Sequence, residues 1–161
     1  MSQVSAIRDH LLHELEHGVA TTRRMLELVK PEQWDYRPRD NMRTLLEVVH
    51  HLVTIPGSDL VIMQEKGMDD VQKVEAAVSG VRDPMQLAAE MERLFGEMKA
   101  YFESLGDDEF LHKETKAFYA EAPAAQVKWL IETTTHVYHH RSQLFSYLKQ
   151  LGHDIQFFIL Y

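Results

Sequence analysis

The chain has 161 residues, 45% hydrophobic and 26% charged, which is enough to bury one core and predicts a single domain over residues 1–161. A net charge of −8 argues against a nucleic-acid partner, and no apolar stretch approaches the roughly 18 residues of a membrane span. The absence of cysteine excludes disulfides and thiolate metal ligands. Because the N-terminus is polar and charged rather than a secretory signal, we expect a cytoplasmic protein.

Helix periodicity runs through most of the chain. Apolar residues recur at three- and four-residue steps over residues 5–30, where Pro31 ends the pattern. A second helix is predicted over residues 44–55, and Pro56 with Gly57 is expected to kink or interrupt it.

Two further helices are predicted in the second half of the chain. Asp83 and Pro84 have the order of an N-cap and a first helical residue, and the pattern that follows extends over residues 83–106. The last helix is predicted over residues 124–151, and no strand pattern competes with it. The four helices predict an all-α bundle whose long connections allow a crossover topology. We expect the apolar tail, residues 155–161, to cap one end of the bundle rather than to form a subunit contact.

Histidine is the outlier of the composition. The chain has 10 histidines, where a chain of this length would carry about three or four. The spacing HxxxH, which places two imidazoles on one face of a helix, occurs at His13/His17 and at His136/His140. About 0.6 such pairs are expected by chance from the composition, so the position of each histidine on its helix has to decide.

Helical-wheel positions, at about 100° per residue, separate the histidines into two groups. The first group is expected to face away from the apolar stripes and comprises His10, His13, His17, His50 and His139. The second group lies on the flanks of the stripes and can reach the interior: His51 on the second helix, with His136 and His140 on the fourth. Three imidazoles from two helices match the three-ligand arrangement with an open position that is typical of catalytic zinc.

A ferritin-like di-iron bundle is the competing interpretation. Two Glu-x-x-His pairs have its ligand spacing, and the other two helices carry further glutamates. The residues in question are Glu14, His17, Glu47, His50, Glu90, Glu97 and Glu132. We disfavour this interpretation because several of these side chains fall on the polar sides of their helices, whereas di-iron ligands project into the bundle core.

The same segments resemble a known family. Residues 44–52, Thr-Leu-Leu-Glu-Val-Val-His-His-Leu, look like the second-helix motif of the DinB/YfiT-like superfamily, and residues 136–144 resemble its H-x-x-x-H-R-x-Q-L signature. The sequence departs from the family at Ser142, where glycine is frequent, and at the break after the second-helix motif. The resemblance implies a four-helix bundle that binds a divalent metal through one histidine of the second helix and both of the signature, which are His51, His136 and His140 here.

The chemistry of such a site is less constrained. Zinc or nickel is the expected ion, with iron and manganese as alternatives, and it could activate water or stabilise a thiolate. The resemblance implies a metal-dependent transferase or hydrolase that acts on a small molecule, with a low-molecular-weight thiol as a candidate cosubstrate, and a homodimer. A metal-bearing binding or stress-response module without turnover is the alternative.

Five other residues have expected roles around the site. Asp59, about two turns beyond the second-helix ligand, is a candidate partner of a ligand or a base, or else a solvated residue beside a kink. Gln143 is expected to be a hydrogen-bonding residue rather than a catalyst, and Arg141 to be ion-paired to an acid on another helix because it falls in the apolar stripe. Trp129 and Tyr147 fit either a pocket wall or the core.

Overall fold

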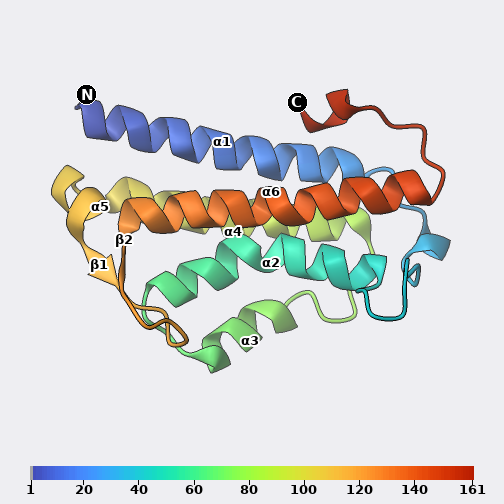
Figure 1. The fold of residues 1–161 in the computed structure, drawn as a ribbon, viewed down its shortest axis with the longest axis horizontal. Coiled ribbons are helices and arrows are strands. Elements are labelled where there is room, and N and C mark those ends of the chain that lie inside the picture. The colour runs from blue at the N-terminus through green and yellow to red at the C-terminus, as the bar shows by residue number, and fades with distance from the viewer. Residues whose placement is uncertain (1) are drawn as a thin grey trace.

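Four long helices form the protein, which is seen here in a computed structural model that describes residues 2–161 (Figure 1). They are α1 (Gln3–Leu26), α2 (Leu45–Met63), α4 (Pro84–Ser104) and α6 (Gln126–Gln150). Figure 1 shows α1 and α6 running in one direction and α2 and α4 in the other. Helices α1 and α2 each pack against both α4 and α6. The connection between the parallel helices α2 and α4 must therefore return along the bundle, which is a crossover of the kind that the long connections allow.

Short elements occupy the connections, and the sequence pattern did not reveal them. They are the 3-10 turn η1 (Pro31–Gln33), α3 (Met68–Ala76), α5 (Asp107–His112), β1 (Glu114–Thr115), β2 (Ala124–Ala125) and the 3-10 turn η2 (Phe157–Leu160). The strands β1 and β2 pair antiparallel and close a hairpin. Each short helix buries a single side chain, Val71 in α3 and Phe110 in α5, which is too few for a helical period to be visible.

Of the two expectations at Pro56, a kink or an interruption, the interruption is wrong, because α2 continues through Pro56 to Met63. Pro56 and Gly57 are both buried, so tertiary packing holds the helix across the backbone hydrogen bond that proline cannot make. Gly57 sits where α2 meets its neighbours: a Cβ there would lie 2.6 Å from Leu94 Cδ2 on α4 and 2.9 Å from Val74 Cγ1 on α3. The unbroken helix keeps the residues beyond Pro56 in register with those before it.

Helix α2 is apolar over a longer stretch than was expected from the sequence. Leu45–Met63 is long and apolar enough, on length and composition alone, to cross a membrane. In the bundle, α2 packs against α3, α4 and α6 and forms the centre of the core. Its beginning is fixed by Thr44, whose side chain accepts from the backbone N–H of Glu47, and the predicted cap at Asp83 likewise accepts from Met85 and Gln86 at the start of α4.

The C-terminal tail does not cap the end of the bundle as expected. After α6 the chain turns back, and η2 packs along α1 (Figure 1). Polar side chains of α1 bind the tail backbone: His17 Nε2 lies 3.0 Å from the carbonyl oxygen of Leu160, and Arg24 donates to that of Tyr161 at 2.8 Å. These hydrogen bonds hold the tail against the side of the bundle, where Phe157 and Phe158 stay exposed.

Candidate metal centre

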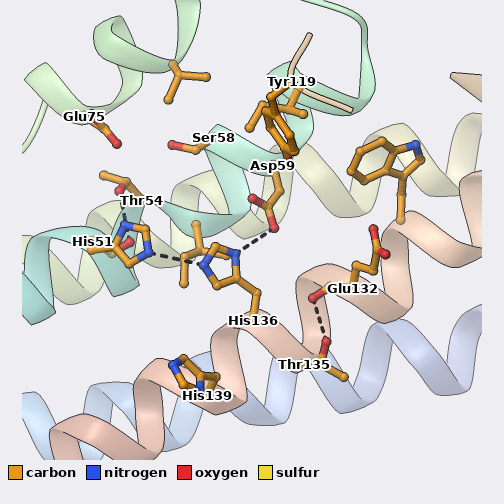
Figure 2. Close-up of a pocket in the computed structure, with 14 residues that line it drawn as sticks. His51, Thr54, Ser58, Asp59, Glu75, Tyr119, Glu132, Thr135, His136 and His139 are labelled. Atoms are coloured by element: carbon orange, nitrogen blue, oxygen red, sulfur yellow. Dashed lines mark hydrogen bonds and ion pairs between the residues drawn. The ribbon is translucent and has the colours of Figure 1, made fainter. Parts of the chain in front are cut away.

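The fold brings the three predicted histidines together between α2 and α6. His51 comes from α2, and His136 and His140 come from successive turns of α6, so that one ring nitrogen of each lies within 4.8 Å of the others. The Nε2 atoms of His51 and His136 are 3.2 Å apart, and the rings of His51 and His140 meet edge to face at 4.4 Å between centroids. Figure 2 shows the imidazoles of His51 and His136 pointing toward each other. The three side chains that their helical-wheel positions indicated therefore do converge.

Two polar side chains hold the α6 histidines from behind. Asp59 Oδ2 lies 3.3 Å from Nδ1 of His136, and Gln143 Oε1 lies 2.7 Å from Nδ1 of His140 (Figure 2 draws the first contact). An acceptor at Nδ1 keeps the proton there and leaves the lone pair of Nε2 directed into the cleft. Asp59 can do this because α2 is not broken at Pro56. The predicted hydrogen-bonding role of Gln143 is confirmed.

The environment lowers the pKa of two of the three imidazoles, those of His51 and His140. Burial is the main cause that lowers the pKa of His51 to about 3, and the charges of His140 and Arg43 act in the same direction. Burial also lowers the pKa of His140, although its hydrogen bond with Gln143 opposes the change. Both imidazoles are therefore in the unprotonated form at neutral pH, which is the form that binds metals.

His51 and His136 line a pocket of about 470 Å³, and His140 lies behind them beside the ring of His51. The pocket lies between α2, α3, α6 and the loop of the β1–β2 hairpin, residues 116–123, and Figure 2 shows its walls. Its lining residues are His51, Thr54, Ile55, Ser58, Asp59, Ile62, Val71, Glu75, Tyr119, Trp129, Glu132, Thr135, His136 and His139. A small molecule could therefore reach the cleft between the imidazoles.

Five other histidines were expected to face away from the bundle interior. His10, His13 and His139 are exposed as predicted, but His139 also lines the pocket. His17 and His50 are partly buried instead, because they lie against the tail and against the loop before α4, where Nε2 of His50 is 2.7 Å from the carbonyl oxygen of Val81. Neither joins the centre.

The ion pair predicted for Arg141 is wrong. Its guanidinium donates to Thr21 Oγ1 at 2.8 Å and to the carbonyl oxygen of Leu160 at 3.2 Å, and it stacks 4.0 Å from the centre of the Tyr138 ring. Within residues 2–161 no carboxylate lies in salt-bridge range of it. Neutral oxygens and an aromatic face thus replace the expected acid. Of the two aromatic candidates, Trp129 lines the pocket and Tyr147 is buried in the core.

The di-iron ligand set does not assemble. Glu14 accepts from the hydroxyl of Tyr138, and Glu47 accepts from the backbone N–H of Thr44 in the helix cap. The glutamates of α4, Glu90 and Glu97, both bind Arg93, and Glu132 lies with Lys128 on α6. Among the residues that the structure describes, only the three histidines form a group of metal-binding side chains.

Several pocket residues had no recognisable signal in the sequence. Glu75 was missed because nothing in the pattern placed α3 beside the centre, and Ser58 lies on α2 beyond the point where the helix was expected to kink or end. Tyr119 lies in a hairpin loop whose strands are two residues each, and Arg43 lines a second hollow of about 300 Å³ on another side of His51. Glu75 and Tyr119 reach the pocket because α3 and the hairpin loop pack beside it. This packing is tertiary information that the sequence pattern does not contain.

Fold and site together define a helical-bundle protein with a three-histidine centre. The DinB superfamily profile matches residues 14–144, and the chain belongs to that superfamily. No curated protein matches the chain.

Three solved structures share the fold. A protein of Exiguobacterium sibiricum, described as a candidate DinB family member, is 29% identical with a TM-score of 0.72, and 99% of each chain is covered. YfiT of Bacillus subtilis, described as a probable metal-dependent hydrolase with an unusual four-helix bundle topology, is 21% identical with a TM-score of 0.72, covering 94% of this chain and 90% of YfiT. The colibactin self-resistance protein ClbS, solved with double-stranded DNA, is 13% identical with a TM-score of 0.62, covering 88% and 95%. At these identities YfiT and ClbS are similar to this chain in fold alone.

Proposed function

We propose that this protein is a metal-dependent hydrolase whose divalent ion is held by His51, His136 and His140. The observation that carries the proposal is the convergence of three imidazole nitrogens within 4.8 Å, where two of the three histidines, His51 and His136, line a pocket of about 470 Å³. The description of YfiT as a probable metal-dependent hydrolase supports the same chemistry.

The donor set fits a zinc-like ion. Tetrahedral coordination with zinc–nitrogen bonds of about 2.0–2.1 Å separates two ligand nitrogens by about 3.3 Å, and the Nε2 atoms of His51 and His136 are 3.2 Å apart. Two of the imidazoles have lowered pKa values, so the ion does not have to displace protons from them at neutral pH. Three nitrogen ligands favour zinc or nickel over manganese. When bound, such an ion supplies Lewis acidity and lowers the pKa of water at its open position toward 7.

The side chains of the protein would orient and exchange protons. Asp59 and Gln143 fix the Nδ1–H tautomers of His136 and His140 and thereby aim both Nε2 lone pairs. Asp59 also lines the pocket, so its carboxylate is the proposed base that takes a proton from the attacking water. Apolar residues such as Ile55, Ile62 and Trp129 exclude water from the inner wall.

A thiol transferase is the second candidate that the residues allow, since the same open position could bind a thiolate. The resemblance to the family is its only support, and the pocket geometry does not distinguish it from hydrolysis. A binding module without turnover predicts the same metal content and no product.

Elemental analysis of untreated protein, followed by hydrolysis assays, tests the proposal. We expect about one equivalent of a divalent ion per chain, and hydrolysis of activated esters or amides by zinc-loaded protein that is lost in His136→Ala. His112→Ala is the matched control, because the side chain of His112 is exposed and hydrogen-bonds Asp108 on its own helix, away from the three histidines. Hydrolysis that survives His136→Ala, or a protein that binds none of zinc, nickel, iron and manganese, would contradict the proposal. Conjugation of a thiol without hydrolysis would favour the transferase.

A further inference from the structure

The charges around the pocket have one sign. Three carboxylates line it, those of Asp59 on α2, Glu75 on α3 and Glu132 on α6, and no lysine or arginine within residues 2–161 does. Figure 2 shows them on different sides of the pocket. Against a doubly charged ion, the wall carries one more negative charge than the ion carries positive. An anionic substrate would meet like charges there, and a cationic one would be attracted.

Two aromatic side chains, Tyr119 and Trp129, line the same pocket as these carboxylates. Tyr119 reaches into the pocket from the hairpin loop and lies next to Asp59 in Figure 2. Burial raises the pKa of its phenol, and the charges of Asp59 and Glu132 raise it further, so the ring stays neutral between two acids. Aromatic faces attract ammonium groups, most strongly where the surroundings are partly desolvated.

The indole of Trp129 and the start of the hairpin loop are held in place, whereas Tyr119 is 67% exposed. Nε1 of Trp129 donates to Thr115 Oγ1 at 3.0 Å, and this bond fixes the indole. The same hydroxyl accepts from Gln126, and the loop is tied to the end of α2 by the hydrogen bond from the Lys116 backbone N–H to Glu65 at 3.1 Å. At the indole a bound molecule therefore meets a prearranged wall rather than one that it must order.

The remaining polar groups around the pocket also favour a cationic molecule. Ser58 lines the pocket, and its buried hydroxyl has no hydrogen-bond partner among the described residues, so the wall keeps an unused acceptor. The ion pair of Glu132 with Lys128, at 2.9 Å, joins two exposed side chains and is of the kind that contributes little. Arg43, which precedes the N-cap of α2, lines the separate hollow beyond His51 and not this pocket.

We propose that the pocket selects substrates in which an ammonium group is attached to an apolar or aromatic body, with the ammonium held between Tyr119, Trp129 and Glu132. The inference rests on the proposed function, because the opposite end of the substrate is then the group that is hydrolysed at the histidines. It predicts that a strongly anionic cosubstrate is a poor fit for this pocket.

Three probes of similar size and different charge test the inference: 2-phenylethylammonium, 2-phenylethanol and 3-phenylpropanoate. The chain has two tryptophans, so the Trp34→Phe variant leaves Trp129 as the only one and its fluorescence reports on the pocket. If that variant does not fold, calorimetric titration of the protein without the substitution measures the relative affinities of the three probes instead. We expect the ammonium to bind at least about 2- to 5-fold more tightly than the alcohol, which is the range for a cation near an aromatic face. The propanoate should bind most weakly.

Four variants locate the effect. Glu132→Gln and Tyr119→Leu should each reduce the preference for the ammonium by about 2- to 5-fold. Their controls are Glu103→Gln, which removes an exposed charge outside the pocket, and Phe118→Leu, which removes the exposed neighbouring ring. Equal binding of ammonium and alcohol, or tighter binding of propanoate, would overturn the inference. All of these titrations are made on protein that has been treated with a chelator to remove metal. Their outcome is therefore independent of metal binding and of hydrolysis.

Discussion

Replacing Asp59 with asparagine tests whether the carboxylate behind His136 supports the metal centre. Asparagine keeps the size of the side chain and a carbonyl oxygen that can accept from Nδ1–H, so the variant removes the negative charge and little else. Loss of such an outer partner of a metal ligand typically reduces metal affinity by about 10- to 100-fold, which corresponds to about 1.4–2.7 kcal/mol. The contact is 3.3 Å long, and the side chain of His136 is 36% exposed. We therefore expect the lower end of that range, about 10-fold.

The measurement is a zinc titration in competition with a chromophoric chelator, accompanied by urea unfolding of the metal-free protein. Asp108→Asn is the control, since Asp108 makes the same kind of contact with His112 at 3.0 Å on the surface of α5. That variant should bind zinc like the parent protein. If Asp59→Asn retains its zinc affinity within about twofold while folding normally, the carboxylate does not support the centre and the reasoning is refuted.

Two further predictions concern stability. The metal-free protein should lose stability as the pH falls from about 6.5 toward 5, because the unfolded chain takes up a proton on His51 that the folded protein, with a pKa of about 3, does not. Urea midpoints at pH 7, 6 and 5 should show a smaller loss in His51→Gln, and parallel pH profiles would contradict the assignment. Gly57→Ala should lower the free energy of unfolding by up to about 2 kcal/mol. Overpacking of the alanine methyl group costs about 1–3 kcal/mol, which outweighs the gain of about 1 kcal/mol from the higher helix propensity of alanine. Gly96→Ala in α4, where a Cβ meets nothing within 4 Å, should instead stabilise by about 0.8–1 kcal/mol in the same chemical unfolding assay, and an equal response of the two glycines would show that the close contact at Gly57 does not matter.

Much of the fold and the whole histidine group could be predicted because both depend on local periodicity. A long amphipathic helix repeats its apolar face many times, so the predicted and observed ranges of the four long helices largely agree, with α2 as the exception. The same period separated His51, His136 and His140 from the other histidines. At Pro56 the local rule failed, because burial between α3 and α4 outweighed the preference of proline to end a helix.

The pocket could not be predicted because its walls come from separate elements. Glu75 and Tyr119 are distant in sequence from the histidines and belong to α3 and a hairpin loop that carry no periodic signal. The partner of Arg141 was mispredicted for a related reason: the tail that supplies the Leu160 carbonyl folds back along α1 instead of covering the end of the bundle. Which segments meet is decided by tertiary packing.

The register of α6 links the metal centre to the tail. His140 and Arg141 are consecutive, so their side chains leave the helix about 100° apart. This angle directs His140 toward α2 and its metal cleft, and Arg141 toward α1, where the guanidinium bonds Thr21 and the tail. Both side chains are buried, so neither can rotate outward without leaving a polar group unpaired. The rotation of α6 that lets Arg141 bond Thr21 is therefore the same rotation that directs His136 and His140 toward His51 on α2.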